Sequence, residues 1–288
     1  MKSYEAMQHI TKTFSIANAP THPQSALPKS EAKSQLKACI KRIKDLHERL
    51  QAEKRQSLLC IFQAMDAAGK DGTIRAVFSG LNPAGIQVTP FGRPTPAELA
   101  RDYLWRVHQA VPPKGQIGVF NRSHYEEVVT VRVFPQFLEA QKLPKVELEV
   151  LMNQRLDDIR AFEKRLAQSG TRILKFFLHV GKAEQKKRLL SRMDTPEKHW
   201  KHDGHDLNCR ARWDDFMAAY QTALRDTSSE EAPWFCVPAD HKPTMRLMVA
   251  LKIQETLMGM TPQFPSVDGK SIAEIQADKA RLLSMDRS

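Results

Sequence analysis

Paired cysteines are missing from this sequence, and their absence excludes two classes of protein. The four cysteines lie far apart with no C-x-x-C pair among them: Cys39, Cys60, Cys209 and Cys236. A zinc ribbon or a disulfide framework needs closely spaced cysteines, so the sequence encodes neither. Isolated thiols are instead typical of a reducing compartment, and we expect the protein to be cytoplasmic.

Long apolar runs are missing as well. No stretch approaches the about 20 apolar residues that a membrane-spanning helix needs, and the N-terminal residues lack the apolar core of a signal peptide. The sequence also contains no G-x-S-x-G elbow of a serine hydrolase. Its basic stretches lack the regularly interleaved aromatic residues of a platform for single-stranded nucleic acid. We therefore expect neither a membrane nor a nucleic acid as the main partner.

What the sequence has in excess is positive charge. Lysine and arginine number 44 against 33 aspartates and glutamates, which gives a net charge of +11 over 288 residues. Such an excess favours an anionic partner: a nucleotide, a long phosphate polymer, a nucleic acid or an acidic membrane. Charge alone does not choose between these partners, and the choice depends on local motifs.

The most informative motif lies between Leu58 and Arg75. An apolar run at 58–62 predicts a buried parallel strand, and Gly69 with Lys70 falls where a following helix would begin. Unpaired N–H groups in the first turn of a helix, the helix dipole and a lysine together attract phosphate. The stretch therefore predicts a phosphate site, while a glycine turn with a solvated lysine is the simpler alternative.

This loop departs from the standard G-x-x-x-x-G-K-[ST] pattern at two positions. Ala64 stands where the first glycine belongs, and Asp71 stands where a hydroxyl would bind magnesium. Asp66 is the nearest carboxylate within the loop. Because Mg²⁺ prefers hard oxygen ligands, we expect Asp66 to hold the metal in place of the missing hydroxyl.

The surrounding chain alternates strands with helices. Further strands are predicted at 86–89, 117–120, 171–180 and 234–237, and helices at about 30–56, 70–81, 95–110, 125–132, 146–168 and 244–258. The strand at 117–120 releases a second polar loop, Asn121-Arg122-Ser123-His124. Parallel strands that release polar residues at their carboxyl ends place them in one crevice, where open α/β sheets bind ligands. We therefore expect an α/β fold in which the two loops share a site.

A basic helical insert separates the last two predicted strands. Residues 184–193 and 208–225 are predicted helices, and a proline-containing segment, 194–201, interrupts them. A helical hairpin at this place fits a lid that closes over phosphates and excludes water. Arg188 and Arg192 share one helix face, where an arginine can stabilise charge on a transferred phosphoryl group. The alternative is that both arginines are ordinary solvent-exposed residues without a function.

Taken together, these motifs resemble those of the polyphosphate kinase 2 family of P-loop phosphotransferases. The likeness is carried by Asp66 to Gly72 in the first loop, Phe120 to Tyr125 in the second, Pro196 to Lys201 in the lid, Trp213-Asp214-Asp215, Ala232-Pro233-Trp234 and Arg246. It runs from about Leu36 to Met258. The resemblance implies a P-loop kinase fold: a thymidylate-kinase-like parallel sheet flanked by helices, with a helical lid.

The resemblance also implies an activity and a site. The implied activity is transfer of a phosphoryl group between inorganic polyphosphate and a nucleotide, with Mg²⁺ or alternatively Mn²⁺. The implied catalytic residues are Asp66, Lys70, Arg122 and, in the lid, Arg192, with Asp66 as the metal ligand. Substrate phosphates are expected to contact the remaining motif residues: Ala67, Ala68, Gly69, Asp71, Gly72, Thr73, Arg75, Asn121, Ser123, His124, Arg188, Lys198 and Lys201.

One departure concerns Asn121, because many members of the family carry an aspartate there. An amide supplies no anionic ligand, so more of the metal binding falls on Asp66. The Asn-Arg-Ser-His form resembles the subgroup that accepts nucleoside mono- and diphosphates. It implies reversible conversion of AMP to ADP and of ADP to ATP, with GMP and GDP as further acceptors. We expect a homo-oligomer, either a dimer or a tetramer.

The predicted organisation is one catalytic domain with two appendages. Residues 1–29 form an extended N-terminal arm that lies on the surface or is partly disordered. Residues 30–262 form the kinase domain with its lid at about 184–212, and residues 263–288 form a C-terminal tail. Two other functions fit the same residues: a nucleoside or nucleotide kinase that uses ATP as donor, and a non-catalytic basic module that binds nucleic acid or another polyanion.

Overall fold

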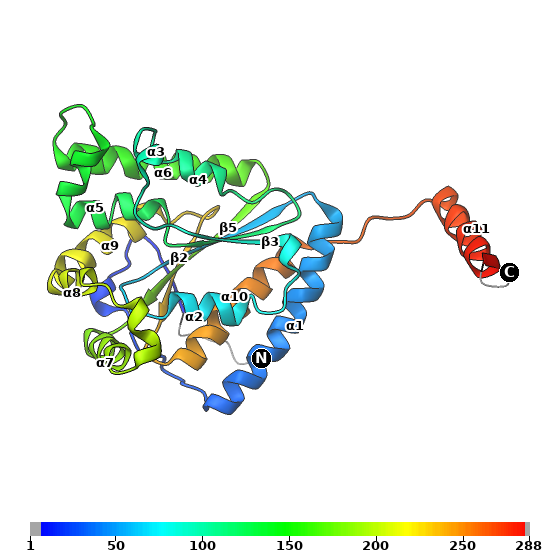
Figure 1. The fold of residues 1–288 in the computed structure, drawn as a ribbon, viewed down its shortest axis with the longest axis horizontal. Helices are drawn as coiled ribbons and strands as arrows, with labels where there is room; N and C mark the ends of the chain where they lie inside the picture. The colour runs from blue at the N-terminus through cyan, green and yellow to red at the C-terminus, as the bar shows by residue number, and fades with distance from the viewer. Residues whose placement is uncertain (1–6, 286–288) are drawn as a thin grey trace.

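A six-stranded sheet forms the centre of the protein, whose computed structural model describes residues 7–285 (Figure 1). In spatial order the strands are β1, β6, β5, β2, β4 and β3. Neighbouring strands run parallel except β1, which is antiparallel to β6. The strands span β1 Gln8–His9, β2 Ser57–Gln63, β3 Ile86–Pro90, β4 Ile117–Asn121, β5 Thr171–His179 and β6 Trp234–Pro238.

Helices cover both faces of the sheet, as strands that are apolar on both sides require. β2 is buried along its whole length, and in Figure 1 α1, α2 and α10 lie on one face while α4 and α6 lie on the other. None of the described helices is long and apolar enough to cross a bilayer. The helices of the body are α1 Lys29–Glu53, α2 Lys70–Val77, α3 Pro96–Leu99, α4 Trp105–Gln109, α5 Thr130–Val133, α6 Leu148–Gln168, α9 Trp213–Thr227 and α10 Lys242–Met260.

The predicted α/β fold and its parallel sheet are confirmed, but the predicted helices at 95–110 and 125–132 are each interrupted, the second because a 3₁₀ turn ends at Glu127 before α5 begins at Thr130. Thr95 caps α3 as the sequence indicates: its hydroxyl accepts from the Glu98 backbone, and the Glu98 carboxylate accepts from the Thr95 backbone. The predicted helix at 95–110 is nevertheless interrupted, because α3 ends at Leu99 and α4 begins at Trp105. Short 3₁₀ turns complete the fold at η1 Ile16–Asn18, η2 Pro83–Gly85, η3 His124–Glu127 and η4 Pro135–Gln141.

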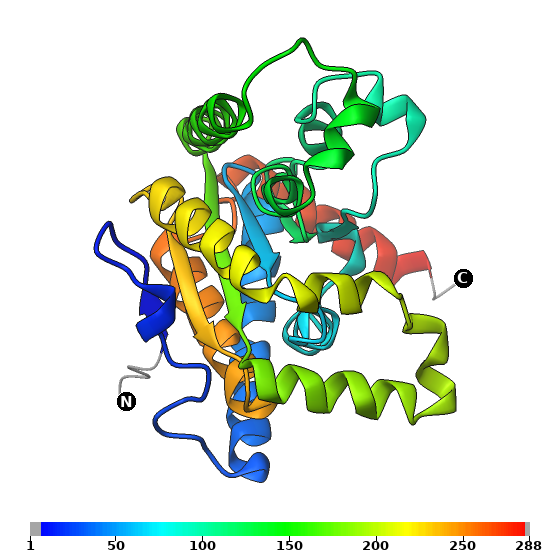
Figure 2. The same cartoon turned by 90° about the vertical axis from the view of Figure 1, so that its left-hand side faces the viewer.

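The insert between β5 and β6 forms the expected helical hairpin, which Figure 2 shows projecting from the carboxyl end of the sheet. It consists of α7 Lys182–Met193, the 3₁₀ turn η5 Pro196–Lys201 and α8 His205–Ala211. The second predicted helix, 208–225, is divided at Arg212 into α8 and α9. The break at Arg212 therefore separates the helical hairpin from the longer helix α9, which packs on the body.

The N-terminal segment corrects one prediction. Instead of lying on the surface, Gln8–His9 adds a strand to β6, and Ile10, Phe14 and Ile16 are buried in the core. The physical reason is that β6 has an open edge, whose backbone groups need partners. Apolar residues scattered among prolines gave no periodic signal of this contact. The first part of the predicted arm, residues 1–6, lies outside the described residues.

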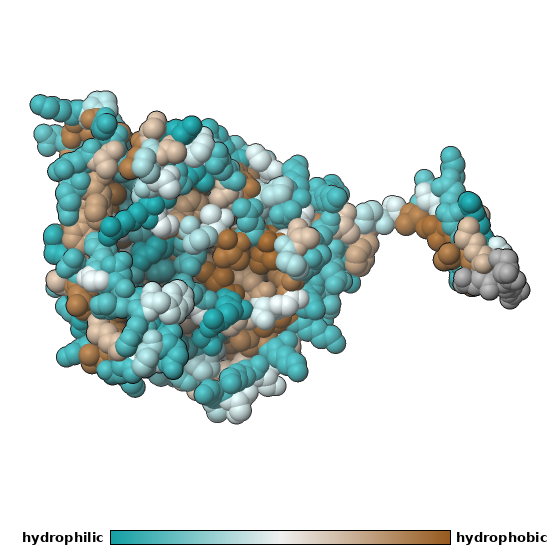
Figure 3. Space-filling view, in the orientation of Figure 1, coloured by the Kyte–Doolittle hydropathy of each residue, from teal (hydrophilic) through white to brown (hydrophobic). Residues whose placement is uncertain are grey.

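The C-terminal segment contains a helix that sequence analysis did not predict. α11 Gly269–Met285 follows an extended linker and lies away from the body in Figure 1. Figure 3 shows apolar side chains along it, and the large ones are about half exposed: Ile272, Ile275, Leu282, Leu283 and Met285. The end of the predicted tail, residues 286–288, lies outside the described residues.

Candidate active site

The first polar loop connects β2 to α2 and has the geometry of a P-loop. β2 ends at Gln63 and α2 begins at Lys70, so residues 64–69 join a buried strand to a helix N-terminus. Gly69 has a φ of +110°, a left-handed conformation that a side chain would strain. This turn places the loop around the start of α2, where the first N–H groups have no acceptor within the helix. The local structure therefore provides the predicted binding place for an anion.

Lys70 carries a buried charge at this place. It is only 8% exposed, and its Nζ donates to the carbonyl oxygen of Ala64 at 3.0 Å. Burial, together with the nearby Arg122, lowers the pKa of Lys70 to about 8. An ammonium has three N–H donors, and among the described residues this bond uses one of them. The side chain is thus a partly desolvated cation with donors available for a phosphate oxygen.

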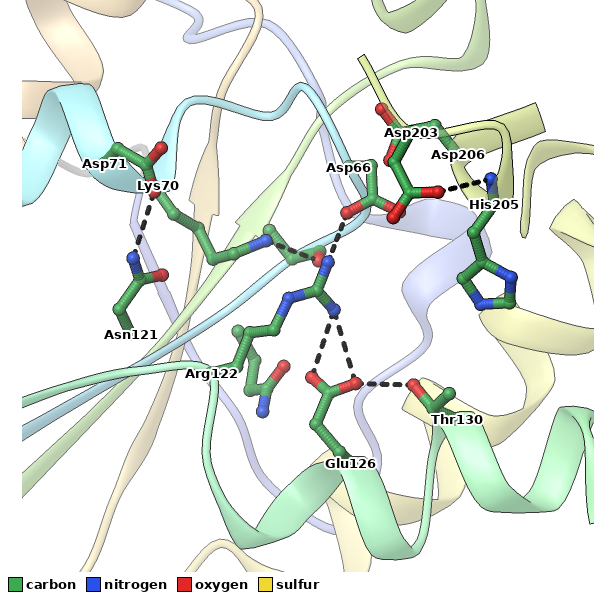
Figure 4. A network of polar contacts seen from close by, with 12 residues as sticks. Asp66, Lys70, Asp71, Asn121, Arg122, Glu126, Thr130, Asp203, His205 and Asp206 are labelled. Carbon is green, nitrogen blue, oxygen red and sulfur yellow. Dashed lines mark hydrogen bonds and ion pairs between the residues drawn. The ribbon is translucent and has the colours of Figure 1, made fainter. Parts of the chain in front are cut away.

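Arg122 follows β4 and reaches across to the first loop (Figure 4). Its guanidinium forms ion pairs with Asp66 and, at 3.2 Å, with Glu126. Its backbone is left-handed, with a φ of +61°, and its N–H donates to the carbonyl of Phe62 at 3.0 Å. Because β2 and β4 pair in parallel, their loops meet at one edge of the sheet. The expected meeting of the two loops is confirmed.

These ion pairs determine the charge of Asp66. Burial favours the neutral acid, but Arg122 and Lys70 outweigh burial and hold the pKa of Asp66 below its usual value. The pKa of Arg122 is raised, chiefly by Glu126, with burial acting in the opposite direction and Asp66 adding to the rise. Asp66 is therefore ionised at neutral pH and faces a permanent cation.

A second group of contacts joins both loops to the lid. The amide nitrogen of Asn121 donates to Oδ1 of Asp71 at 3.0 Å, and Lys201 of η5 forms an ion pair with Asp71 at 3.7 Å. Burial would raise the pKa of Asp71, but the bond from Asn121 and the charge of Lys70 hold it below its usual value. The lid thus contacts the start of α2 through a pair of opposite charges.

The two lid arginines do different things. Arg188 donates to four carbonyl oxygens beside the cleft, those of Ala67 at 3.3 Å, Ala68 at 2.7 Å, Ala239 at 2.7 Å and Asp240 at 3.0 Å. Arg192 forms an ion pair with Asp206 of α8 at 2.6 Å. Burial and the charge of Asp66 raise the pKa of Asp206, while Arg192 acts in the opposite direction. Arg188 is therefore bonded to the P-loop backbone, whereas Arg192 is bonded within the lid.

These side chains surround one cleft of about 780 Å³. The predicted site residues that line it are Asp66, Ala67, Ala68, Gly69, Lys70, Asp71, Gly72, Arg75, Asn121, Arg122, Arg188, Arg192, Lys198 and Lys201. Residues far apart in the sequence are thus brought to one space by the two loops and the lid.

Three of the predicted substrate contacts do not line the cleft, because their side chains point into the interior. Thr73 is fully buried and its hydroxyl donates to the Gly69 carbonyl at 2.9 Å. Ser123 is also fully buried and caps η3, its Oγ accepting from the Tyr125 backbone at 3.2 Å. His124 is 1% exposed, and its Nε2 lies 3.6 Å from Glu163 in the core. A tight turn directs neighbouring side chains to opposite sides, so only Asn121 and Arg122 of this loop face the cleft.

Sequence reasoning also missed cations that line the cleft, notably Lys187 on α7 and Lys242 and Arg246 at the start of α10. Burial and neighbouring arginines lower the pKa of Lys242 and of Arg246. The Nε of Arg246 is buried without a partner among the described residues. None of these three residues belongs to a local phosphate-binding pattern. The sequence indicated only Arg246, through its place in a motif shared with the family. Together they extend the positive surface beyond the P-loop.

The oxygen atoms in the cleft suit a magnesium ion. The carboxylates of Asp66 and Asp71 and the amide of Asn121 line the same space. Within the described residues, no group of three or more histidines, cysteines, aspartates or glutamates could hold a metal by itself. Mg²⁺ is commonly bound by one or two carboxylates together with substrate phosphates and water. The residues present therefore fit an ion that substrate would help to hold.

The parallel sheet, the glycine turn with its buried lysine, the facing arginine and the helical lid define the class of the protein: it is a P-loop phosphotransferase. Comparison with known proteins then gives the family. The model of polyphosphate kinase 2 matches residues 26–265, and the chain belongs to this family.

Relatives and solved structures agree with this assignment. The chain is 46% identical to the ADP-polyphosphate phosphotransferase of Rhodopseudomonas palustris, over 86% of each chain. It is 46% identical to the AMP/ADP-polyphosphate phosphotransferase of Meiothermus ruber, over 84% of this chain and 87% of the relative. The crystal structure of polyphosphate kinase 2 from Arthrobacter aurescens superposes with a TM-score of 0.86 at 38% identity, covering 94% of this chain and 95% of that one.

Proposed function

We propose that this protein transfers the terminal phosphoryl group of inorganic polyphosphate to AMP and to ADP, and that it catalyses the reverse reaction. The observation that carries the proposal is the surplus of cations in the cleft beyond the P-loop, formed by Arg75, Lys187, Lys198, Lys242 and Arg246. Basic residues outnumber acidic ones in this cleft even with Glu184 and Asp206 counted. Such a surplus favours an extended polyanion, whose successive phosphates can meet successive cations.

The geometry supports direct in-line transfer. A terminal phosphate oxygen of the acceptor attacks the end phosphorus of polyphosphate, a new P–O bond forms, and the shortened polymer leaves with the electron pair of the broken bond. Lys70 and Arg122 hold the oxygens of the transferred group from two sides. Arg192 adds a third cation when it leaves Asp206, and the closed lid excludes water from the reacting phosphorus.

We assign the metal to the oxygen atoms beside Lys70. Asp66 would hold Mg²⁺, with Asp71 and the amide oxygen of Asn121 beside it, and Mn²⁺ is the alternative ion. When bound, the ion neutralises phosphate charge. The ion pair with Arg122 also holds the Asp66 carboxylate in one orientation relative to the cleft.

The choice of acceptors rests on the names of relatives and on the second loop. The Meiothermus ruber relative is named for both AMP and ADP, and the Rhodopseudomonas palustris relative for ADP. A relative from Pseudomonas aeruginosa, 33% identical over 68% of this chain, is named a GDP-polyphosphate phosphotransferase. We therefore propose AMP and ADP as the main acceptors, with GMP and GDP as further ones.

The deciding experiment incubates the purified protein with Mg²⁺, long-chain polyphosphate and each of AMP, ADP, GMP and GDP in turn. ADP and ATP should form from the adenine nucleotides without any other donor. Absence of ATP above a background of adenylate kinase activity refutes the proposal. Activity with ATP as the only donor would instead identify an ordinary nucleotide kinase. Binding of polyphosphate or nucleic acid without turnover would identify a non-catalytic basic module.

We further propose a homo-oligomer, a dimer or a tetramer, that acts in the cytoplasm without nucleic acid or membrane partners. The half-exposed apolar residues of α11 support oligomerisation, because an isolated helix of this length is marginal in water. Light scattering after gel filtration measures the mass directly. A monomer at micromolar concentration contradicts this part of the proposal. We propose 30–262 as the catalytic domain, to whose sheet and core residues 8–16 also contribute, and 263–288 as an appendage.

A further inference from the structure

A lysine lies at the centre of the sheet, on the strand next to the P-loop strand. Lys175 of β5 is fully buried and pairs in register with Ile61 of β2. A buried ammonium is unfavourable unless each of its N–H groups finds an acceptor. Lys175 has three: the Tyr125 hydroxyl at 2.9 Å, the Thr227 carbonyl at 2.8 Å and the Glu163 carboxylate at 2.5 Å.

Its ionic partner, Glu163, comes from α6 on the face of the sheet. Glu163 is 2% exposed and also accepts a hydrogen bond from the Tyr125 hydroxyl at 2.8 Å. Burial would raise the pKa of Glu163, but Lys175 holds it below its usual value. The Tyr125 hydroxyl therefore bonds both members of the pair, accepting from the ammonium and donating to the carboxylate. Its single proton is shared with Thr227, whose Oγ1 lies 2.8 Å from the phenol oxygen and itself donates to the Ala223 carbonyl, so three side chains hold that oxygen.

Tyr125 connects this buried pair to the active site. It stands three residues after Arg122, at the start of η3, and its backbone N–H bonds the Ser123 side chain. The left-handed backbone of Arg122 is a sparsely populated conformation that persists only where the surroundings determine it. On one side the Phe62 carbonyl holds the Arg122 N–H. On the other side the loop is tied to the core through the ring and hydroxyl of Tyr125.

Stability alone does not explain a charged pair at this place. Well-packed apolar residues of similar volume are often as stable as a buried ion pair, or more stable. A buried ion pair differs from apolar packing in direction, because its hydrogen bonds accept only one arrangement of their partners. That property is useful where one backbone conformation has to be selected, as it is at Arg122.

We propose that Lys175 and Glu163 are positioning residues, which act through the Tyr125 hydroxyl to hold Arg122 in its direction toward the P-loop. The inference rests on the proposed function, because Arg122 is the group whose placement matters. None of the three buried side chains touches the cleft; their effect on turnover is transmitted by the loop.

Tyr125→Phe is the mildest test, since it removes only the hydroxyl that links the pair to the loop. At a temperature where the folded fraction matches wild type, kcat should fall about 10-fold or more while KM for ADP stays within about 2-fold, because a displaced Arg122 weakens the transition state rather than substrate binding. The matched control is Tyr103→Phe, which removes a hydroxyl that donates to the Arg155 carbonyl at 3.4 Å. Its kcat should equal that of wild type.

A double-mutant cycle with Arg122→Met separates positioning from general stability. Once Arg122 is gone, Tyr125→Phe should change kcat no further. The double variant Lys175→Met with Glu163→Gln removes both charges together and should reproduce the kcat loss of Tyr125→Phe. If it does not fold, the Tyr125 cycle decides alone.

Two results would overturn the inference. One is a wild-type kcat in Tyr125→Phe with only a lower unfolding temperature, which is a purely structural effect. The other is a loss that persists in full in the Arg122→Met background, which means that the hydroxyl acts elsewhere. Failure of the proposed function is distinguishable, because wild type would then form no ATP from polyphosphate and ADP.

Discussion

Replacing Lys70 by methionine is expected to make the protein more stable and nearly inactive. The pKa of Lys70 falls from 10.5 to about 8 in the fold, mainly because of burial. This fall corresponds to roughly 3 kcal/mol by which the fold disfavours the charged form. Methionine has a similar length and no charge, and it gives up the bond to the Ala64 carbonyl, a contribution of about 1 kcal/mol. We therefore expect Lys70→Met to raise the free energy of unfolding by about 2 kcal/mol at pH 7.

The same pKa gives the stability of wild type a pH dependence. Between about pH 8 and 10.5 the unfolded chain keeps a proton that the folded Lys70 has lost. The unfolded state then binds more protons, so the stability of wild type rises with pH through this window. Lys70→Met lacks this rise. The difference in stability between the two proteins should be largest below pH 8 and fade toward pH 10.5.

Both effects can be measured on the same preparations by urea unfolding and by initial rates with polyphosphate and ADP. Turnover of Lys70→Met should fall about 100-fold or more, because a preorganised cation is lost from the reacting phosphate. For wild type, kcat/KM should decrease as the pH rises through about 8, where Lys70 loses its charge. Lys41→Met, on the exposed side of α1, is the control and should change neither stability nor rate. A variant that is less stable than wild type, or that keeps its rate, refutes the reasoning.

Other predictions address the metal, the lid and the polymer. Asp66→Asn should lower turnover about 100-fold or more and raise the Mg²⁺ concentration needed for half-maximal rate; near-wild-type rates would exclude Asp66 as the ligand. EDTA should stop turnover, and excess Mg²⁺ should restore it. Arg192→Ala should lower turnover with an unchanged unfolding midpoint, whereas Arg188→Ala should lower the midpoint because four carbonyls lose their donor; the reverse outcome assigns the lid role to Arg188. Arg246→Gln should raise KM for long polyphosphate more than KM for ADP, and equal changes would contradict a polymer-binding role.

The parts of the site that are local in sequence were predictable. A buried strand, a left-handed glycine and a lysine at a helix start follow one another within residues 58–70, so pattern and geometry coincide there. The contact between Asp66 and Arg122 was predictable indirectly. It depends only on two parallel strands whose following loops lie at the same edge of the sheet. The α/β class followed from the alternation of strands and helices for the same reason.

Contacts that depend on the direction of a single side chain were not predictable. His124 and Ser123 stand beside Arg122 in the sequence but face the core, because the turn after β4 reverses direction within one residue. Lys242 and Arg246 reach the cleft because α10, which follows β6, packs against α2, an arrangement that no local pattern encodes. The strand at Gln8–His9 was missed likewise, since its partner is more than 200 residues away.

The partners of that N-terminal strand and of the segment after it are translated much later than the segment itself. β1 pairs with β6, the Thr21 carbonyl accepts from the Asp240 backbone, and the Leu27 backbone donates to Thr244. Residues 8–27 can therefore make these contacts only after residues 234–244 have been synthesised. Until residues 234–244 have been translated, the edge of the sheet stays open to other chains, and a nascent-chain chaperone would find its binding place there.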